Sequence, residues 1–260
     1  MITKIILEEE LNTEELQKLE ILFKETQQDI LNDFLILTDS PELARICRKL
    51  DMAVAAVLSG EDKDFTGISY AVAGTDDLDK GYLERIWQRY RGIPWDICET
   101  ARCFVRETTP EDVESFYRIY SDKSITAYME NLFEDRDEEK RYIRDYIEKV
   151  YGFYGFGMWT VCLKETGEVI GRAGLSMREE FEEPELGYVI GEKWQGRGIA
   201  EEVCREILAY GRDELGFEQV RALMHPENKA SKRLCGKLGF CYKAEITLDG
   251  ELYDLYTVEL

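Results

Sequence analysis

Basic residues are scarce in this sequence of 260 residues, where 33 Lys and Arg stand against 54 Asp and Glu for a formal net charge of −21. Proteins that bind nucleic acid gain most of their affinity from basic side chains that displace counterions from phosphates. The balance of charge therefore excludes a general nucleic-acid binder. Any anionic ligand must be held locally, by a few cations or by backbone N–H groups.

Long apolar runs are also absent from the sequence. No stretch approaches the roughly 18 apolar residues of a membrane span, and the run from Ile5 to Leu7 is too short for the core of a signal peptide. Hydrophobic residues nevertheless make up 44% of the chain, which is enough to bury a core. We expect a globular, cytoplasmic protein that does not act at a membrane.

Histidine is missing too, apart from the single His225, and the seven cysteines are scattered without a C-x-x-C pair. Zinc sites need Cys and His ligands at short, fixed spacings, so we expect no metal site. Reduced and mostly buried thiols are the expectation for an odd number of cysteines in a cytoplasmic chain.

The order of the predicted elements changes near residue 100. Before it, strand-like and helix-like segments alternate. Helices are predicted from Leu16 to Leu31, from Pro41 to Leu50 and from Leu83 to Tyr90, and strands at 1–7, 34–38, 53–58 and 69–73. Such alternation predicts an α/β fold with a small, Rossmann-like parallel sheet. We therefore expect two domains, residues 1–100 and 101–260.

Residues 101–260 are predicted to form a mixed sheet, because two of the strands make a hairpin around Thr166-Gly167. Strands are predicted at 103–107, 158–164, 169–176, 186–190, 220–224, 240–246 and 252–258. Helices are predicted from Thr109-Pro110, which has an N-cap signature, and at 138–150, 198–213 and 228–238.

A glycine-rich turn lies between a predicted strand and a predicted helix and consists of Gln195, Gly196, Arg197, Gly198, Ile199 and Ala200. Glycines let backbone N–H groups turn toward a ligand, and the free N–H groups and dipole at a helix start favour negative charge. The turn lacks the third glycine of the dinucleotide fingerprint and the Gly-Lys-Ser/Thr of the P-loop. It predicts a phosphate site of another kind, with a purely structural tight turn as the alternative.

The turn resembles the pyrophosphate-binding motif of the GNAT N-acetyltransferases, Q/R-x-x-G-x-G/A, with Gln195, Gly198 and Ala200 at its fixed positions. The stretch from Asn228 to Phe240 resembles the family's second motif, N-x-x-A/S-x-x-L-x-x-K-x-G-F, and the predicted element order over 102–260 is similar to the GNAT fold. Glu185-Leu-Gly-Tyr188 is most similar to the RimJ/RimL-like branch, which includes ribosomal-protein N-terminal acetylases and small-amine acetylases.

The resemblance implies acetyl-CoA as the donor and a direct transfer to a primary amine in a ternary complex. Strand residues from Tyr188 to Ile190 would pair with the pantetheine arm, and the N–H group of Val189 or Ile190 would bind the thioester carbonyl. The N–H groups of the glycine-rich turn would take the pyrophosphate, and Asn228 would anchor the arm. Six basic residues concentrate around the two motifs: Lys193, Arg197, Lys229, Lys232, Arg233 and Lys237.

The proton donor is less clear from the sequence, because Cys235 stands where many family members carry a tyrosine, seven residues after Asn228. Cys235 could donate a proton or simply pack in the core. Ser231 is the preferred donor, with an ordinary helix serine as the alternative. Glu185 is the preferred base ahead of His225, and Tyr188 could hold a bridging water or pack on the sheet.

Acidic residues are dense in three segments that the resemblance places on the acceptor side. The loop from Arg178 to Glu185 holds five glutamates in eight residues. The other two segments contain Glu130, Glu134, Asp135 and Asp137, and Asp249, Glu251 and Asp254. A negative mouth would attract a cationic acceptor such as a polyamine, an aminosugar or a basic protein N-terminus. A solubilising surface is the alternative, and a homodimer is left open.

The first domain carries weaker signals. Leu35 to Ser40 is faintly similar to the second motif of haloacid-dehalogenase-like hydrolases, but no D-x-D pair precedes it. We therefore expect an accessory domain. Because Cys235 replaces the usual tyrosine, an acyl-CoA-binding sensor or pseudoenzyme without turnover remains the alternative to an active enzyme.

Overall fold

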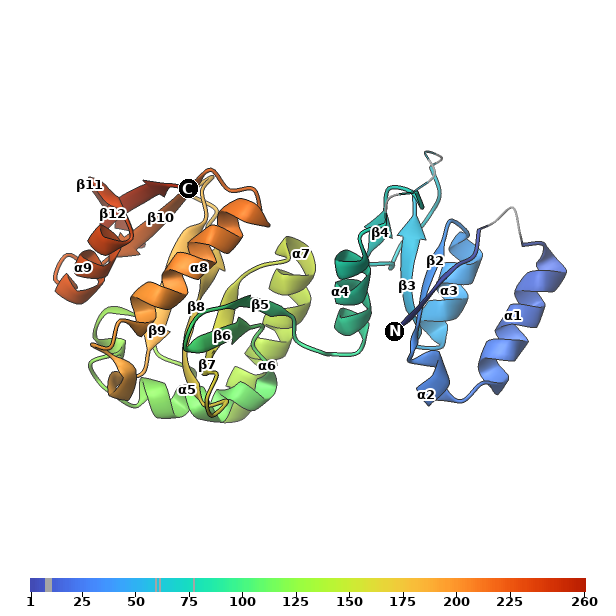
Figure 1. Ribbon diagram of the computed structural model, residues 1–260, viewed down its shortest axis with the longest axis horizontal. Helices are drawn as coiled ribbons and strands as arrows, with labels where there is room; N and C mark the ends of the chain where they lie inside the picture. The colour runs from blue at the N-terminus through green and yellow to red at the C-terminus, as the bar shows by residue number, and fades with distance from the viewer. Residues whose placement is uncertain (8–10, 59, 61, 77) are drawn as a thin grey trace. The chain divides into compact units, whose positions relative to one another are not determined.

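The computed structural model describes residues 1–7, 11–58, 60, 62–76 and 78–260, which form two compact units, Met1–Trp95 and Asp96–Leu260 (Figure 1). The division falls slightly before the boundary expected at residue 100. The reason is β5 (Asp96–Glu99), an unexpected strand that pairs with β6 (Cys103–Arg106) of the second unit. No helix in the described part of the chain combines the length and the apolar character needed to cross a membrane.

The N-terminal unit has a four-stranded sheet in the order β1-β2-β3-β4. Its elements are β1 (Ile2–Ile5), α1 (Thr13–Glu25), α2 (Gln28–Leu31), β2 (Phe34–Thr38), α3 (Pro41–Lys49), β3 (Ala53–Val57), β4 (Ala71–Val72) and α4 (Lys80–Tyr90). All of the strand pairs are parallel, which confirms the predicted parallel α/β sheet. The helical stretch predicted as one segment is two helices, because the extended backbone of Thr26 ends α1.

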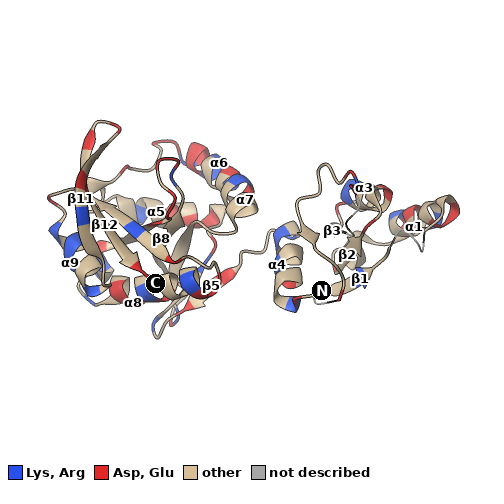
Figure 2. Ribbon diagram, turned by 90° about the horizontal axis from the view of Figure 1, so that it is seen from above, with Lys and Arg blue, Asp and Glu red and all other residues tan. Residues whose placement is uncertain are grey.

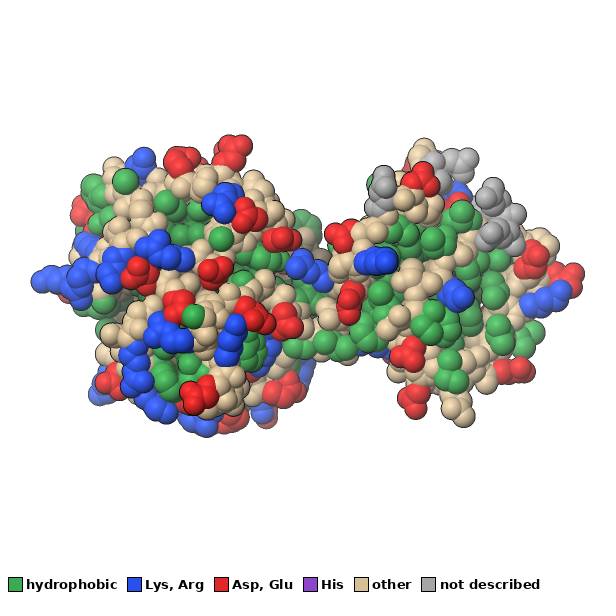
Figure 3. All heavy atoms as spheres, viewed as in Figure 1, with side chains coloured by type: hydrophobic (Ala, Val, Ile, Leu, Met, Phe, Trp, Pro, Cys, Tyr) green, Lys and Arg blue, Asp and Glu red, His purple; other side chains and the backbone are tan. Residues whose placement is uncertain are grey.

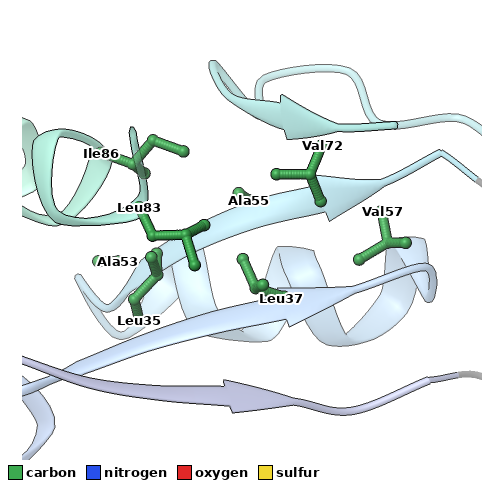
Figure 4. Packing of buried hydrophobic residues seen from close by; sticks show 8 residues of the cluster. All are labelled: Leu35, Leu37, Ala53, Ala55, Val57, Val72, Leu83 and Ile86. Atoms are coloured by element: carbon green, nitrogen blue, oxygen red, sulfur yellow. The ribbon is translucent and has the colours of Figure 1, made fainter. Parts of the chain in front are cut away.

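Helices cover both faces of this sheet, so β2 and β3 are apolar at nearly every position. One face packs against α4 in a cluster of Leu35, Leu37, Ala53, Ala55, Val57, Val72, Leu83 and Ile86 (Figure 4). The other packs against α3 and includes Ile36, Val54, Leu43, Ala44 and Cys47. The alternation of neighbouring strand residues between these two clusters follows from the two-residue period of a strand.

Hydrophobic side chains also remain at the surface of this unit (Figure 3). Helix α1 buries none of its residues fully, and Ile21 and Leu22 are more than half exposed. Its contact with the core comes from half-buried residues such as Leu16 and Leu19.

The C-terminal unit has an eight-stranded sheet in the order β11-β12-β10-β9-β8-β7-β6-β5, which confirms the predicted mixed sheet and adds β5 to the seven predicted strands. Its further strands are β7 (Met158–Leu163), β8 (Val169–Ser176), β9 (Glu185–Ile190), β10 (Gln219–Met224), β11 (Cys241–Leu248) and β12 (Glu251–Glu259). Its helical segments are η2 (Pro110–Asp112), α5 (Val113–Tyr120), η3 (Thr126–Tyr128), α6 (Arg136–Tyr146), η4 (Ile147–Tyr151), α7 (Gly152–Tyr154), η5 (Glu192–Trp194), α8 (Ile199–Asp213) and α9 (Lys229–Lys237).

The two faces of this sheet are covered by different helices. On one face Trp159 of β7 packs edge-on against Tyr210 of α8, with ring centres 5.6 Å apart. On the other face the guanidinium of Arg172 lies 4.8 Å from the centre of the Phe116 ring of α5, and Val189 packs against the same helix. Residues of β9 therefore face α8 and α5 in turn, which decides where each predicted site residue points.

A buried polar network fixes the start of α5. Arg106 binds Asp112 through two hydrogen bonds of 2.8 and 2.7 Å, and the Asp112 carboxylate also accepts from the Thr109 N–H group and the Thr160 hydroxyl. The side chain of Asp112 is 5% exposed and that of Arg106 is 19% exposed. Solvent therefore cannot replace these bonds, and the network ties α5 to strands β6 and β7.

We predict that Asp112→Ala lowers the free energy of unfolding of the C-terminal unit by about 2–3 kcal/mol, because it leaves the partly buried Arg106 charge without its hydrogen-bond partner. Urea unfolding followed by tryptophan fluorescence measures the change. Asp145→Ala is the matched control, since it breaks the exposed pair with Lys149 and should cause no measurable loss. Equal losses in the two variants would show that the Arg106 network does not stabilise the unit.

Candidate active site

The candidate site lies where β9 and β10 separate. Among the described strands of the larger sheet these two alone run parallel, and they share one register pair, Glu185 with Arg221. The Arg221 N–H group donates to the Pro184 carbonyl at 2.9 Å beside this pair. Further on, β9 pairs with β8 as far as Ile190, and β10 pairs with β12 as far as Met224. Beyond Glu185 the two strands therefore leave facing edges that are not bonded to each other.

Backbone direction along β9 decides which N–H groups face this opening. The Gly191 N–H group donates to the Ile170 carbonyl of the neighbouring strand segment at 2.8 Å, so that of Val189, two residues earlier, also points toward β8. The N–H groups of Tyr188 and Ile190 point the other way, toward β10. Of the two donors predicted for a thioester carbonyl, Ile190 is the one whose direction fits.

The glycine-rich turn joins β9 to α8. Gly196 and Gly198 have φ values of 71° and 76°, a region that residues with side chains rarely adopt. Gly198 is the N-cap of α8, and no side chain among the described residues caps this helix. Its first N–H groups are therefore available to an anion. The Gln195 side chain has a bracing role instead, since its Nε2 donates to the Ile190 carbonyl at 2.9 Å.

Two basic side chains lie close to the aromatic ring of Trp194, which directly precedes the turn. The guanidinium of Arg197 lies 5.1 Å from the centre of the Trp194 ring, and the ammonium of Lys193 lies 4.8 Å from it. Two cations thus flank one aromatic ring beside the turn. The side chain of Ile199 is buried, and Ala200 follows it in the first turn of α8.

Arg102, which the sequence did not single out, reaches this turn from the start of β6. Its Nη1 donates to the Arg197 carbonyl at 2.9 Å, and its Nε donates to the Glu202 carboxylate at 2.7 Å. The sequence offers no signal for this contact, because Arg102 and Arg197 are 95 residues apart.

Tyr188 and Ser231 lie together on the face of the sheet that α8 and α9 cover. The Tyr188 hydroxyl donates to Ser231 Oγ at 2.8 Å. Burial raises the pKa of Tyr188 above its ordinary value, so this hydroxyl stays protonated. Asn228 is the N-cap of α9, and its side chain accepts from the Ser231 N–H group at 3.1 Å. Three of the predicted site residues are therefore adjacent.

Cys235 lies on the same helix but is only 1% exposed. Burial raises the pKa of its thiol to about 12. This environment matches the packing alternative, because a buried thiol of high pKa is a poor proton donor to a group in the cleft. All seven cysteines are free, and five of them, including Cys235, are buried.

Glu185 points to the opposite face of β9 from Tyr188, since the two are separated by three positions in a strand. Its Oε2 accepts from Arg178 Nε at 2.7 Å and lies 3.9 Å from Arg221 Nη2. Burial raises the pKa of the Glu185 carboxyl, while the two guanidiniums oppose the rise. A carboxyl with a raised pKa beside the strand opening fits a general base. The water predicted to link it to Tyr188 would have to reach across the sheet.

Arg221 is another residue that the sequence reading passed over. It is fully buried, its guanidinium lies 3.9 Å from the centre of the Phe181 ring, and its Nη1 donates to the Glu183 carbonyl. Its Nε and Nη2 have no hydrogen-bond partner among the described residues. The available signal was a lone arginine within the otherwise apolar stretch of 220–224.

His225 is half-buried at the end of β10, where its ring stacks on Tyr128 of η3 with centres 5.0 Å apart. Its Nδ1 accepts from the Glu227 N–H group at 3.2 Å. A neutral imidazole that accepts at Nδ1 carries its proton on Nε2, which leaves no lone pair for the proton of an amine. This geometry favours Glu185 over His225 as the base.

Ion pairs modify the predicted charge pattern. Asp254 is buried and pairs with Lys232, so neither adds a free charge to its segment. Lys237 pairs with Glu201 at 3.0 Å. Among the described residues, no carboxylate lies within ion-pair distance of three of the basic residues expected around the motifs: Arg197, Lys229 and Arg233. Figure 2 shows the Lys and Arg residues along α9.

The polar residues at the end of β2 have structural partners. Thr38 Oγ1 accepts from the Ser40 N–H group at 3.1 Å, and Ser40 Oγ accepts from the Leu43 N–H group as the N-cap of α3. They fix the start of a helix, which accounts for them without phosphatase chemistry. Among the described residues no group of three or more His, Cys, Asp or Glu could hold a metal ion.

Comparison with known proteins identifies the family. Residues 102–241 match the model of the acetyltransferase (GNAT) domain. The uncharacterized N-acetyltransferase YoaA of Bacillus subtilis is 30% identical over 148 residues, which cover 55% of this chain and 82% of that protein. The ribosomal protein uS5-alanine N-acetyltransferase of Escherichia coli is 32% identical over 118 residues, covering 43% of this chain and 59% of that protein.

A solved structure of RimL, a ribosomal L7/L12 alpha-N-protein acetyltransferase, in complex with coenzyme A has a similar fold. Its TM-score is 0.53 at 13% identity, and the match covers 64% of this chain and 98% of that one.

Proposed function

Since the chain belongs to the GNAT acetyltransferase family and is an N-acetyltransferase, we propose that it transfers an acetyl group from acetyl-CoA to a primary amine of a cationic acceptor. The observation that carries the proposal is the opening between β9 and β10, which ends at the uncapped, glycine-rich start of α8. A pantetheine arm needs an unpaired strand edge, and a pyrophosphate needs free N–H groups.

The donor fits the residues of this opening. The N–H groups of Gly198, Ile199 and Ala200 would hold the pyrophosphate, with Arg197 adding positive charge beside them. The backbone of Tyr188 and Ile190 would pair with the arm. Gln195 and Gly196 would support the glycine-rich turn, Gln195 through its bond to the Ile190 carbonyl. Asn228, at the start of α9, would anchor the arm.

The chemistry proposed is direct transfer within a ternary complex. Glu185 takes one proton from the acceptor ammonium, and the neutral nitrogen then bonds to the thioester carbonyl carbon while the Ile190 N–H group stabilises the oxyanion. The carbon–sulfur bond breaks as the intermediate collapses. The second proton of the nitrogen ends on the sulfur, bridged by the Ser231 hydroxyl, which Tyr188 orients.

Glu185 and Ser231 belong to opposite faces of the sheet, and this separation supports a ternary complex. The base would meet the acceptor on the side of α5, while the proton bridge would meet the thiolate on the side of α9. The acetyl group between them would lie in the strand opening. Glu185 would act on the acceptor and Ser231 on the donor. The acceptor and acetyl-CoA can therefore be bound at the same time.

The acceptor class follows from charge. Glu179, Glu180 and Glu182 are exposed on the loop before β9, next to the proposed base. Their field would raise the local concentration of a cationic amine, such as a polyamine, an aminosugar or a basic protein N-terminus. The E. coli relative is named for acetylating the alanine of a ribosomal protein, which is consistent with the last class.

For the N-terminal unit we propose an accessory role outside the chemistry. Its strand order runs β1-β2-β3-β4 without reversal, so the described strands lack the switch point at which open α/β sheets bind ligands. An acyl-CoA sensor without turnover remains the alternative for the C-terminal unit, because Cys235 is buried where a tyrosine is common in the family.

Gly198→Glu is predicted to abolish acetyl-CoA binding, because a side chain at a φ of 76° strains the turn whose N–H groups would hold the pyrophosphate, and its carboxylate adds a negative charge close to them. Calorimetric titration measures the loss. Gly167→Glu is the matched control, since Gly167 also has a positive φ, at 69°, and lies in the β7–β8 turn. Undiminished affinity in Gly198→Glu would refute the placement of the pyrophosphate.

Ser231→Ala is predicted to lower kcat about tenfold while the KM for acetyl-CoA changes less than about threefold, since the proton bridge acts mainly in the transition state. Steady-state kinetics with both substrates varied measure the split. Cys235→Ala should retain nearly the full rate. The assignment is wrong if Cys235→Ala loses activity and Ser231→Ala does not.

Arg178→Gln is predicted to move the acidic limb of the kcat/KM profile to higher pH. Glu185 must be ionised to accept a proton, and the positive charge of Arg178 lowers its pKa, so removal of that charge raises the pKa. Arg178→Lys keeps the charge and should leave the limb in place. An unmoved limb in Arg178→Gln would exclude Glu185 as the titrating base.

A further inference from the structure

The first turn of α8 presents an electrostatic problem for the proposed donor site. It contains two glutamates, Glu201 and Glu202, directly after the N–H groups that would bind pyrophosphate. Carboxylates at a helix start stabilise the helix through its dipole, but here they would repel the anionic ligand from the same N–H groups. An acetyl-CoA site at this turn therefore requires that both charges be compensated.

Both carboxylates have cationic partners. Glu201 pairs with Arg205 and Lys237, each at 3.0 Å. Glu202 binds Arg102, whose backbone N–H group and Nε donate to its two oxygens at 2.9 and 2.7 Å. Burial acts to raise the pKa of Glu202, but hydrogen bonds from Thr100 and Arg102 hold it below its ordinary value. Glu202 is therefore a carboxylate whose charge is matched by Arg102.

Arg102 also sets the direction of one peptide group in the glycine-rich turn. Its Nη1 donates to the Arg197 carbonyl at 2.9 Å. In a trans peptide the carbonyl of one residue and the N–H of the next point in opposite directions. A carbonyl of Arg197 held toward Arg102 therefore turns the Gly198 N–H group away from it, toward the side where a ligand would bind. A Cβ at Gly198 would lie 3.7 Å from Arg102 Nη2, so the guanidinium sits directly beneath the turn.

Hydrogen bonds of the β5–β6 turn fix the backbone of Arg102. Thr100 Oγ1 accepts from the N–H groups of Arg102 and Cys103, at 3.3 and 2.8 Å. The Arg102 carbonyl accepts from the Lys164 N–H group at 2.9 Å. The backbone of Arg102 is thus fixed by the sheet before any ligand binds, which lowers the entropy lost on binding.

We propose that Arg102 is a positioning residue for acetyl-CoA. Arg102 neutralises Glu202 and orients the Gly198 N–H group toward the pyrophosphate. The inference rests on the proposed function, since it assumes that the donor binds at this turn. It adds a residue outside both GNAT motifs, contributed by a turn far away in the sequence.

Calorimetric titration of the full chain with acetyl-CoA tests the proposal. Arg102→Gln should weaken binding about tenfold, because it leaves the Glu202 charge uncompensated beside the pyrophosphate. The double variant Arg102→Gln with Glu202→Gln should recover affinity to within about threefold of the unchanged chain, since the repulsion is gone and only the hydrogen bond to the Arg197 carbonyl stays lost. A purely structural role for Arg102 predicts no such rescue.

A truncated donor supplies the second readout. S-acetylpantetheine lacks the pyrophosphate, so its kcat/KM should change less than about twofold between the unchanged chain and Arg102→Gln. An unchanged acetyl-CoA affinity in Arg102→Gln, or a failed rescue by Glu202→Gln, would overturn the role of Arg102 alone. Absence of acetyl-CoA binding to the unchanged chain would instead overturn the proposed function, and this inference with it.

Discussion

The loss of pairing between β9 and β10 is the constraint on which the rest of the site depends. The strands share a register at Glu185 and Arg221 and then follow different neighbours, β8 and β12. Backbone N–H groups on an unbonded edge need partners, and a ligand with amide groups can supply them. The same separation directs the N–H groups of Tyr188 and Ile190 into the opening. The alternation of side chains along β9 then puts Glu185 on one face of the sheet and Tyr188, with its partner Ser231, on the other.

Charge compensation is the second theme of the structure. A chain with a net charge of −21 would have to bind a polyanionic donor against long-range repulsion, and the proposed donor site lies where individual carboxylates are paired with cations. Arg102 forms an ion pair with Glu202, and Lys237 and Arg205 form ion pairs with Glu201. The exposed glutamates of the loop before β9 have a different role in this account, since they favour a cation. The two substrates would thus meet surfaces of opposite local charge on one acidic protein.

Much of the fold could be predicted from local pattern. Short continuous apolar runs located β2 and β3, and Thr109 with Pro110 located the start of the helical segment before α5. The strand β5 was missed because Asp96–Glu99 is short and half polar, and the break at Thr26 was missed because the helical spacing continues across it. Motif spacing brought Tyr188, Ser231 and Asn228 forward as site residues, and they are adjacent in the structure. The contacts of Arg102 with Arg197 and of Arg221 with Glu185 follow from tertiary packing, which leaves no local trace in the sequence.

Acetylation of cationic amines with acetyl-CoA as the donor is the activity proposed for this chain. Release of CoA thiol from acetyl-CoA, measured with polyamines, aminoglycosides, basic N-terminal peptides and matched neutral or acidic amines, tests it most directly. We expect release with at least one cationic class, with a rate that falls as salt screens the acidic loop, and little release with the acidic amines. Tight binding of acetyl-CoA without release by any amine would rule out this activity and favour an acyl-CoA sensor.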